Sequence, residues 1–146
     1  MNGLELLQAI AAGEAPGAPI AELLGFAPVE AEEGRVVFAS VPRAEHYNPL
    51  GSVHGGLAAT LLDSAMGCAV HTTLPEGKGY TTLELKVNFT RPITTETGPV
   101  VCEGAVLHRG GRVATAEGRV TAERTGKLLA HGTTTCLIIS LDGHAA

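Results

Sequence analysis

The chain of 146 residues has no tryptophan, and aromatic residues make up only 3% of it. Proteins that bind single-stranded nucleic acid stack bases on aromatic side chains, so this shortage argues against that class. The net charge of −5 likewise offers no basic surface for a phosphate backbone. We therefore expect no nucleic-acid partner.

Cysteine is also scarce: Cys68, Cys102 and Cys136 are the only three, and none belongs to a CxxC motif. An odd number without a disulfide framework is typical of reduced, buried thiols and predicts a cytoplasmic protein. The N-terminus lacks the basic and apolar segments of a secretory signal. No apolar run is long enough to span a bilayer, so we expect no membrane partner.

Hydrophobic residues make up 45% of the chain and charged residues 17%, which indicates a globular protein rather than a disordered one. The length suits one domain with a core of its own. We expect a single domain over residues 1–146, in which residues 1–25 form a helical segment and residues 26–140 form the core.

Turn-forming residues divide the chain into segments of clear periodicity. Apolar residues at helical spacing predict short helices at residues 3–12 and 20–24. Residues 99–140 read as three long strands joined by short turns, which predicts an antiparallel meander. The predicted strands are residues 26–32, 35–42, 80–93, 99–108, 112–123 and 127–140, and residues 141–146 are expected to fray.

The strand at residues 80–93 has the clearest alternation in the chain. Leu83, Leu85, Val87 and Phe89 are expected to point to one side, and the polar residues between them to the other. This pattern is typical of a strand with one covered face.

Residues 57–71 form the only long helical pattern in the middle of the chain. Apolar residues fill more than half of the helical circumference, while Thr60, Ser64, Gly67 and His71 make a narrow polar strip. A helix that is apolar over so wide an arc is buried. Asp63, at the edge of the strip, is then a carboxylate on a mostly buried helix, which is costly unless the charge is used or paired.

The order of elements is a helix, two strands, one long buried helix and then three or four long strands. An antiparallel sheet curled around one long central helix satisfies this order. The sequence therefore predicts an α+β fold in which the concave face of the sheet buries the helix. The part of the helix left uncovered, which includes Asp63, would face a partner subunit.

The start of this helix offers a second polar feature. Gly55 and Gly56 expose backbone N–H groups where the first N–H groups of a helix are unpaired and its dipole is positive. Such a place suits an anion or an oxyanion. Alternatively, both glycines serve only to shape the loop and allow close packing.

Gly55 and Asp63 are too far apart to act together within one helix. They are eight residues apart in the sequence, which is roughly 12 Å along a helix axis. Two antiparallel copies of the helix, related by a twofold axis, could bring Gly55 of one chain near Asp63 of the other. If the two residues share a site, that site straddles a dimer interface.

Three features together resemble a known family: the run Asn48-Pro-Leu-Gly-Ser-Val-His-Gly-Gly, Asp63 seven residues later, and the strand end Asn88-Phe-Thr-Arg-Pro-Ile. They resemble hotdog-fold acyl-CoA thioesterases of the phenylacetic acid degradation type, which are similar to 4-hydroxybenzoyl-CoA thioesterases of the His-Gly-Gly kind. The similarity spans residues 26–139. It implies a hotdog fold, hydrolysis of an acyl-CoA thioester, and no cofactor, since coenzyme A is part of the substrate.

The resemblance assigns roles residue by residue. The helical carboxylate of the family, its nucleophile or general base, matches Asp63. The backbone N–H that polarises the thioester carbonyl matches Gly55, with Gly56 as an aid. The loop amide that holds water or the thioester matches Asn48.

Further roles follow more loosely from the same resemblance. Some relatives use a hydroxyl near the start of the strand after the helix, which is a role for Thr81 or Thr82. The family is commonly a dimer of dimers with sites across the dimer seam, so a homodimer or homotetramer is expected. Members bind coenzyme A through basic residues near the mouth of the site, for which Arg91, Arg109 and Arg112 are candidates.

Simpler interpretations stand beside these roles. Asn48 before a proline also suits a plain turn, and His54 suits an orienting hydrogen bond better than a general base. Cys68 and His71 are three residues apart, but no third ligand accompanies them, so no metal site is expected. The segment before Gly55 is not Gly-x-Ser-x-Gly, which argues against an α/β-hydrolase.

Two other functions remain open. A hotdog hydratase or dehydratase acting on enoyl thioesters would carry Asp-x-Asn-Pro-Leu-His, but His46 replaces its Asp and Gly51 its His. A non-catalytic acyl-CoA-binding sensor of this fold usually carries a DNA-binding segment, for which this chain has neither room nor charge. The sequence therefore favours a thioesterase and leaves its acyl group undetermined.

Overall fold

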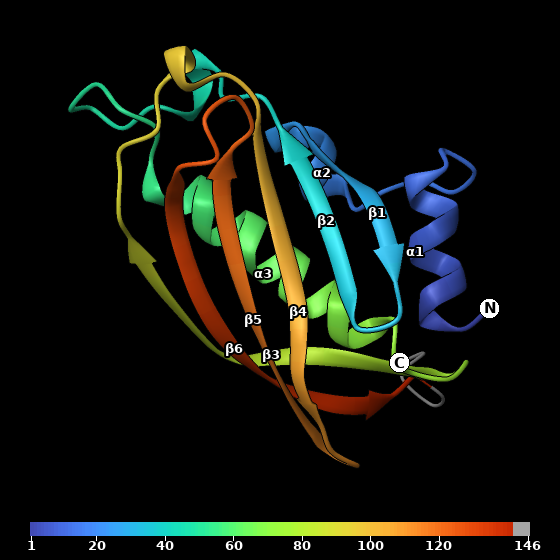
Figure 1. Ribbon diagram of the computed structural model, residues 1–146. Coiled ribbons are helices and arrows are strands. Elements are labelled where there is room, and N and C mark those ends of the chain that lie inside the picture. Colours follow the sequence, from blue (N-terminus) through green and yellow to red (C-terminus); the bar gives the residue numbers. More distant parts are fainter. Residues whose placement is uncertain (142–146) are drawn as a thin grey trace.

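The computed structural model describes residues 1–141 and has the predicted antiparallel sheet wrapped around one long helix (Figure 1). Most predicted elements agree with the structure within a few residues. The helices are α1 (Gly3–Ala11), α2 (Pro19–Leu24) and α3 (Gly55–His71), with 3-10 turns at Ala44–His46 and Thr95–Thr97. The strands are β1 (Phe26–Glu32), β2 (Arg35–Ser40), β3 (Lys78–Phe89), β4 (Val100–Arg109), β5 (Val113–Ala122) and β6 (Leu128–Ser140).

The strands of the described chain form one sheet in the order β1-β2-β4-β5-β6-β3, with antiparallel neighbours throughout. Strands β4, β5 and β6 are the predicted meander, and β1 and β3 are the edges. Helix α3 packs against the concave face and supplies much of the buried core, including Leu61, Leu62, Ala65 and Met66. No helix among residues 1–141 is both long and apolar enough to cross a bilayer.

Two glycines let α3 approach the sheet closely. Gly104 of β4 pairs with Gly118 of β5 directly beneath the helix. A Cβ atom at position 104 would overlap the Ala65 backbone and lie 2.6 Å from the Met66 nitrogen. A Cβ atom at position 118 would lie 2.9 Å from a methyl carbon of Leu62. The sheet therefore has no room for larger side chains at this crossing, and the glycines fix the height of the helix above it.

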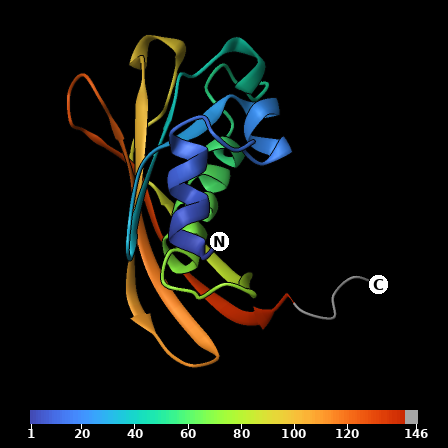
Figure 2. The same ribbon diagram turned by 90° about the vertical axis from the view of Figure 1, so that its right-hand side faces the viewer.

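The N-terminal helices cover part of α3 within the same chain. Figure 2 shows α1 lying next to α3 on the concave side of the sheet. Gly3, at the start of α1, packs against the backbone of His71 at the end of α3. Part of the polar strip of α3, at His71, is therefore covered by the chain itself. The uncovered part of the helix, which the sequence predicted to face a partner subunit, is correspondingly smaller.

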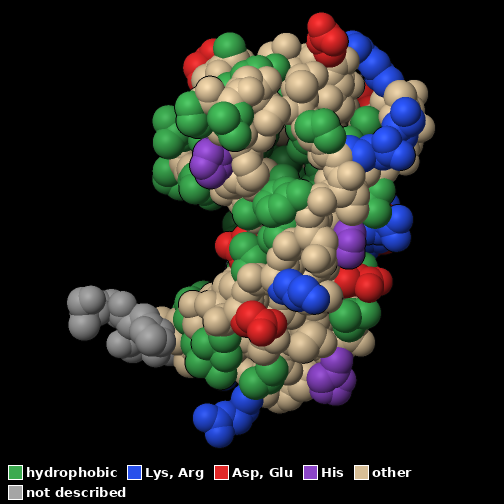
Figure 3. Space-filling view, turned by 90° about the vertical axis from the view of Figure 1, so that its left-hand side faces the viewer, with side chains coloured by type: hydrophobic (Ala, Val, Ile, Leu, Met, Phe, Trp, Pro, Cys, Tyr) green, Lys and Arg blue, Asp and Glu red, His purple; other side chains and the backbone are tan. Residues whose placement is uncertain are grey.

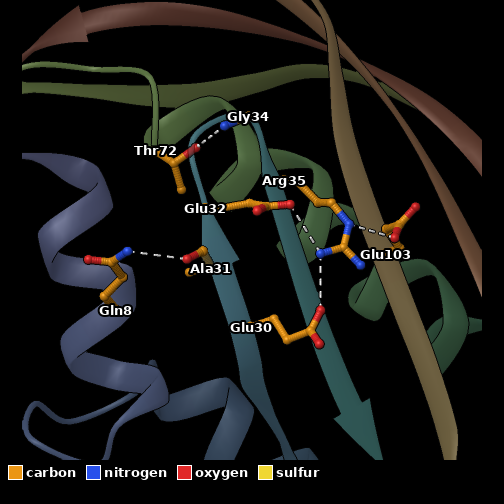
Figure 4. Close-up of polar contacts among 8 residues, drawn as sticks. All are labelled: Gln8, Glu30, Ala31, Glu32, Gly34, Arg35, Thr72 and Glu103. Atoms are coloured by element: carbon orange, nitrogen blue, oxygen red, sulfur yellow. Dashed lines mark hydrogen bonds and ion pairs between the residues drawn. The ribbon is translucent and has the colours of Figure 1, made fainter.

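Side-chain hydrogen bonds join the β1–β2 hairpin to α1, to the end of α3 and to β4 (Figure 4). The Gln8 amide donates to the Ala31 carbonyl, and the Gly34 N–H donates to the Thr72 hydroxyl at the end of α3. Arg35 donates to the Glu103 carboxylate at 2.7 Å and also pairs with Glu30 and Glu32. Because these contacts join α1, the hairpin and α3, they hold the N-terminal part of the chain in a fixed place.

Strand β3 is shorter than predicted at its end. It stops at Phe89 rather than continuing to Ile93. The N–H groups of Thr90 and Arg91 both donate to the Leu129 carbonyl, which turns the chain away from the ladder just before Pro92. Proline cannot donate to a ladder, so the strand ends where its hydrogen bonds must stop.

A β-bulge between Thr82 and Glu84 changes which residues of β3 face the helix, so the predicted alternation is wrong at the start of the strand. Thr82 pairs with the buried Cys136, so it faces the helix rather than the opposite side. Leu83 is the extra residue of the bulge, and beyond it Leu85 pairs with buried Thr134 and again faces inward. The bulge therefore changes which residues alternate inward, as bulges do.

The apolar side chains of β3 are also less covered than the alternation predicted. Leu83 and Phe89 are each 59% exposed and Leu85 is 37% exposed. The strand lies at the edge of the sheet, so α3 shields only part of it. Of the residues predicted to fray, 142–146 lie outside the described residues.

The close approach of α3 gives the first prediction. Gly104→Ala should lower the free energy of unfolding by roughly 1–3 kcal/mol, because the added methyl group must push α3 away from the sheet. Urea denaturation followed by circular dichroism measures the change. Gly111→Ala is the control, since nothing lies within 4 Å of its added Cβ atom. Equal stability of the two variants would contradict close packing of α3 on the sheet.

Candidate active site

The loop before α3 is held by the Asn48 side chain. Its Oδ1 atom accepts hydrogen bonds from the N–H groups of Leu50, at 2.9 Å, and Ser52, at 3.3 Å. Its Nδ2 atom donates to the Ser52 hydroxyl at 3.2 Å. Asn48 thus forms the turn that the simpler interpretation expected, and one of its two Nδ2 hydrogens is left for another acceptor.

His54 caps α3. Its Nδ1 atom accepts the Gly56 N–H at 2.7 Å, which agrees with an orienting role for this side chain. Gly56 is therefore already engaged and is not a free second donor. Within residues 1–141 the Gly55 N–H has no hydrogen-bond acceptor, and it is the first residue of the helix. This leaves Gly55 as the donor at the positive end of the helix dipole.

Gly55 lies in a pocket of about 420 Å³. The Phe89 ring covers it closely, because a Cβ atom at position 55 would lie 3.0 Å from that ring. Arg91 also lines the pocket. Figure 3 views this side of the molecule and shows a hollow lined by hydrophobic side chains, with Lys and Arg side chains gathered beside it. The other lining residues are Ser52, Val53, His54, Ala58, Thr90, Pro92, Ile93 and Leu129.

Asp63 lies further along α3 and is only partly buried. The Thr82 hydroxyl donates to its Oδ1 atom at 2.9 Å. Among residues 1–141 no Lys, Arg or His forms an ion pair with Asp63. Its position in the middle of the helix also excludes a capping role. Of the two threonines proposed from the sequence, the structure brings Thr82 to Asp63 and leaves Thr81 exposed on the other face.

Beyond Asp63, α3 and β3 pack through Tyr80. Its ring fills the space beside Gly67 and meets the His71 ring edge-on, with the centroids 5.7 Å apart. Burial lowers the pKa of His71 and raises the pKa of Tyr80. Burial also raises the pKa of the Cys68 thiol to about 12, so this cysteine stays protonated and unreactive at neutral pH.

Helix α3 and strand β3 run in opposite directions where they contact each other. Gly55 meets Phe89 at the end of β3, whereas Asp63 meets Thr82 near its start. The N–H donor and the carboxylate therefore lie at different ends of the same helix–strand pair, as the spacing in the sequence predicted. One chain does not bring them together.

The three arginines proposed for coenzyme A do not gather in one place within the chain. Arg109 and Arg112 flank the β4–β5 turn. Arg109 pairs with Ala114 of β5, which in turn pairs with Cys136 of β6. The Arg91 N–H instead donates to the carbonyl of Leu129, which precedes Cys136 by seven residues on β6. Along the strands, Arg91 and Arg109 are therefore separated by roughly 23 Å.

Two other cations accompany Arg91. A second hollow of about 330 Å³ shares Arg91, Pro92 and Leu129 with the Gly55 pocket, and Arg124 and Lys127 line it. Neither cation was predicted from the sequence, because both belong to the β5–β6 turn and no motif links that turn to the 48–56 loop. Among residues 1–141 no group of three or more His, Cys, Asp or Glu side chains could hold a metal ion.

Comparison with known proteins identifies the family. The model of the Thioesterase superfamily matches residues 50–129, which is more than half of the chain. The chain belongs to the thioesterase superfamily. Its match to human Acyl-coenzyme A thioesterase 13 is 32% identical over 105 residues and covers 71% of this chain and 73% of that protein.

Solved structures agree with this family. A phenylacetic acid degradation-related protein of Ralstonia eutropha superposes with a TM-score of 0.80 and 29% identity, covering 90% of this chain and 98% of that one. The predicted hotdog fold and the resemblance to the phenylacetic acid degradation type are confirmed. A further match, to a Halobacterium salinarum protein, is 39% identical over 69 residues but spans only 44% of that protein.

Proposed function

We propose that this thioesterase-superfamily member is an acyl-CoA thioesterase that hydrolyses an acyl- or aryl-CoA to the free acid and coenzyme A. One observation carries the proposal: Asp63 is a partly buried carboxylate on a mostly buried helix, it has no cationic partner among the described residues, and its one hydrogen bond comes from Thr82. A partly desolvated carboxylate without a cation is explained if it acts in the reaction. The relative named as an acyl-CoA thioesterase supports the same class.

The Gly55 N–H supplies the second requirement of the reaction. In the proposed complex it donates to the thioester carbonyl oxygen, which becomes negative when the carbon is attacked. The helix dipole adds to this stabilisation. Asn48, with one amide hydrogen left, would hold the attacking water or the thioester.

Asp63 would act in one of two ways. As a nucleophile it attacks the carbonyl carbon, the C–S bond breaks, and water hydrolyses the resulting anhydride. As a general base it takes a proton from the water that attacks the same carbon. In both routes the coenzyme A thiolate leaves and takes up a proton, and one water is consumed.

The complete site requires two copies of the chain. The outer edge of β3 has no partner strand among the described residues, and its exposed side chains include Leu83 and Phe89. Two β3 edges paired antiparallel about a twofold axis would place the Phe89 end of one strand near the Thr82 end of the other. Gly55 of one subunit would then approach Asp63 of its partner, in a homodimer that further pairs into a tetramer.

Replacing Asp63 tests the proposed function directly. Wild-type protein should release thiol from at least one member of a panel of acetyl-, octanoyl-, palmitoyl-, benzoyl- and phenylacetyl-CoA. Asp63→Asn should lower kcat by roughly a hundredfold or more, the usual size of a lost acid–base contribution, while still binding the substrate. Glu84→Gln removes an exposed carboxylate nearby and is the control. Hydrolysis at the wild-type rate by Asp63→Asn would refute the mechanism.

The hydrogen bond to Asp63 gives a separate prediction. Thr82→Val keeps the shape of the side chain but removes the donor, so kcat should fall by roughly tenfold to a hundredfold. Thr82→Ser restores the hydroxyl and should recover most of the activity. Thr81→Val is the matched control, because Thr81 is exposed and forms no hydrogen bond with Asp63 in the described structure. If Thr81→Val and Thr82→Val have equal kcat values, Thr82 does not position the carboxylate.

The cations beside the Gly55 pocket are proposed to bind the phosphates of coenzyme A. Arg91, Arg124 and Lys127 line a hollow that continues from that pocket, and charged nitrogens bind phosphate oxygens well. Glu96 also lines the hollow and keeps its potential from being uniformly positive.

Replacing each cation by neutral glutamine tests which of them bind the phosphates, those beside the Gly55 pocket or those proposed from the sequence alone. Arg124→Gln and Lys127→Gln should each raise KM severalfold for every acyl-CoA with little change in kcat, and the effect should shrink at high salt. Arg109→Gln, at the far end of the sheet, should leave KM unchanged. A larger KM increase from Arg109→Gln than from the other two variants would overturn this placement of the phosphates.

A further inference from the structure

A second cavity lies between the N-terminal helices and α3. Its volume is about 300 Å³, and it is separate from the pocket at Gly55. Apolar side chains from α1, α2, β1 and β2 form most of its wall. The lining residues are Leu7, Ile10, Gly17, Ala18, Ala21, Glu22, Phe26, Ala27, Pro28, Phe38, Ser64, Cys68 and Tyr80.

This cavity borders the Asp63 end of α3. Ser64, which directly follows Asp63, lies on its wall together with Cys68 one turn later. Tyr80 closes another side, and it shares a face of β3 with Thr82, the donor to Asp63. If the carbonyl carbon of a thioester is held at the Asp63 carboxylate, the acyl group attached to that carbon lies beside this cavity.

The wall is suited to an uncharged group. Glu22 is the only charged side chain in the lining, and it is exposed. Cys68 is a neutral thiol at neutral pH because burial raises its pKa to about 12, and burial likewise keeps the Tyr80 phenol protonated by raising its pKa. An acyl group carrying its own carboxylate would be repelled by Asp63 and Glu22 and would find no cation in the wall.

The size of the cavity limits what fits. A buried apolar cavity of about 150 Å³ holds one benzene ring, so about 300 Å³ holds on the order of twelve carbon atoms. Leu7 and Ile10 of α1 form part of the wall. The hydrogen bond from Gln8 to the Ala31 carbonyl holds α1 against β1 (Figure 4). The family match begins at residue 50, so most of this wall comes from a part of the chain outside that match.

We propose that this cavity receives the acyl portion of the thioester and restricts the substrates to uncharged aryl groups and alkyl chains of short to medium length. The inference rests on the proposed thioesterase function, because it assumes that the carbonyl carbon is held at Asp63. Residues between 7 and 38, which form most of the wall, would then help to determine acyl-group specificity together with Ser64, Cys68 and Tyr80.

Two substitutions with opposite effects on cavity volume test this proposal. Ser64→Leu fills the cavity from the α3 side with a good helix former, and Ile10→Ala enlarges it from α1. Leu6→Ala is the matched control, because Leu6 is also partly buried on α1 but does not line the cavity. The measured quantity is kcat/KM for acetyl-, butanoyl-, hexanoyl-, octanoyl-, dodecanoyl-, phenylacetyl- and succinyl-CoA, with butanoyl-CoA as the uncharged match to succinyl-CoA.

Ser64→Leu should lower kcat/KM for phenylacetyl-CoA, relative to kcat/KM for acetyl-CoA, at least tenfold. Ile10→Ala should shift the alkyl preference toward longer chains, by about fourfold for each added methylene that becomes accommodated. Leu6→Ala should leave the wild-type profile unchanged, and succinyl-CoA should be the poorest substrate of its length. A profile that is the same in wild type, Ser64→Leu and Ile10→Ala would overturn the proposal while leaving the thioesterase function intact.

A failure of the underlying function gives a different result. If the wild type hydrolyses no acyl-CoA, the proposed function fails, and with it the acyl-binding role of the cavity. Binding of phenylacetamide, an uncharged probe without coenzyme A, then reports on the cavity itself. Tyr80 lines it and is one of only two tyrosines, so tyrosine fluorescence follows the titration. Binding by wild type but not by Ser64→Leu would identify an apolar ligand site unconnected with thioester hydrolysis.

Discussion

The contact between α3 and the glycines of the sheet determines where everything else lies. Because Gly104 and Gly118 carry no side chains, the helix backbone at Ala65 lies almost directly on β4, and the Leu62 and Met66 side chains lie on β5. The sheet then curls around the helix, and the wide apolar arc of α3 is buried on both sides of this contact. The helix cannot slide or rotate without bringing Cβ atoms into collision.

A helix fixed in this way presents its polar features at defined places. Its first N–H group opens into the pocket under Phe89, and its only carboxylate meets Thr82 two turns further on. The same rigidity keeps these two groups apart, because no bending of α3 could join them. The division of the site between two ends of the helix is thus a consequence of the packing, and it is the physical reason for expecting a second subunit in the reaction.

Much of the fold could be predicted from the sequence because it depends on local periodicity. The bounds of β1 and the extent of α3 follow from alternation and from the apolar arc, and the α3 spacing of Gly55 and Asp63 is simple geometry. The bulge at Leu83 could not be seen, because one extra residue leaves a plausible alternation on either side of it. The same is true of Gly104, which looks like any strand glycine until the helix is placed above it.

The candidate site was predictable to a similar degree. Asp63, Gly55 and Asn48 stand in one short motif, so their roles could be proposed together. The cations Arg124 and Lys127 come from a turn distant in sequence, and only the tertiary fold brings them to Arg91. The cavity beside Ser64 could not be predicted either, because only the tertiary fold places α1, α2 and β1 around the Ser64 face of α3.

We propose that one active site is built from Gly55 of one subunit and Asp63 of the other. Subunit exchange between two inactive variants, Asp63→Asn and Gly55→Pro, tests this arrangement most directly. Proline suits the first position of a helix and the extended conformation of His54 (ψ 135°), so Gly55→Pro removes the N–H without opposing the local backbone. Its Cβ atom would lie 3.0 Å from the Phe89 ring, which must shift slightly to admit it. Gly55→Ala keeps the N–H and controls for the added carbon, and light scattering verifies that each variant forms dimers.

Random exchange makes half of the dimers mixed, and each mixed dimer has one of its two sites intact. Thiol release from the best substrate should therefore rise from background to about a quarter of the wild-type rate. If thiol release by the mixture stays at background after mass spectrometry has verified the exchange of subunits, the active site is not shared between two chains and the proposed arrangement is wrong.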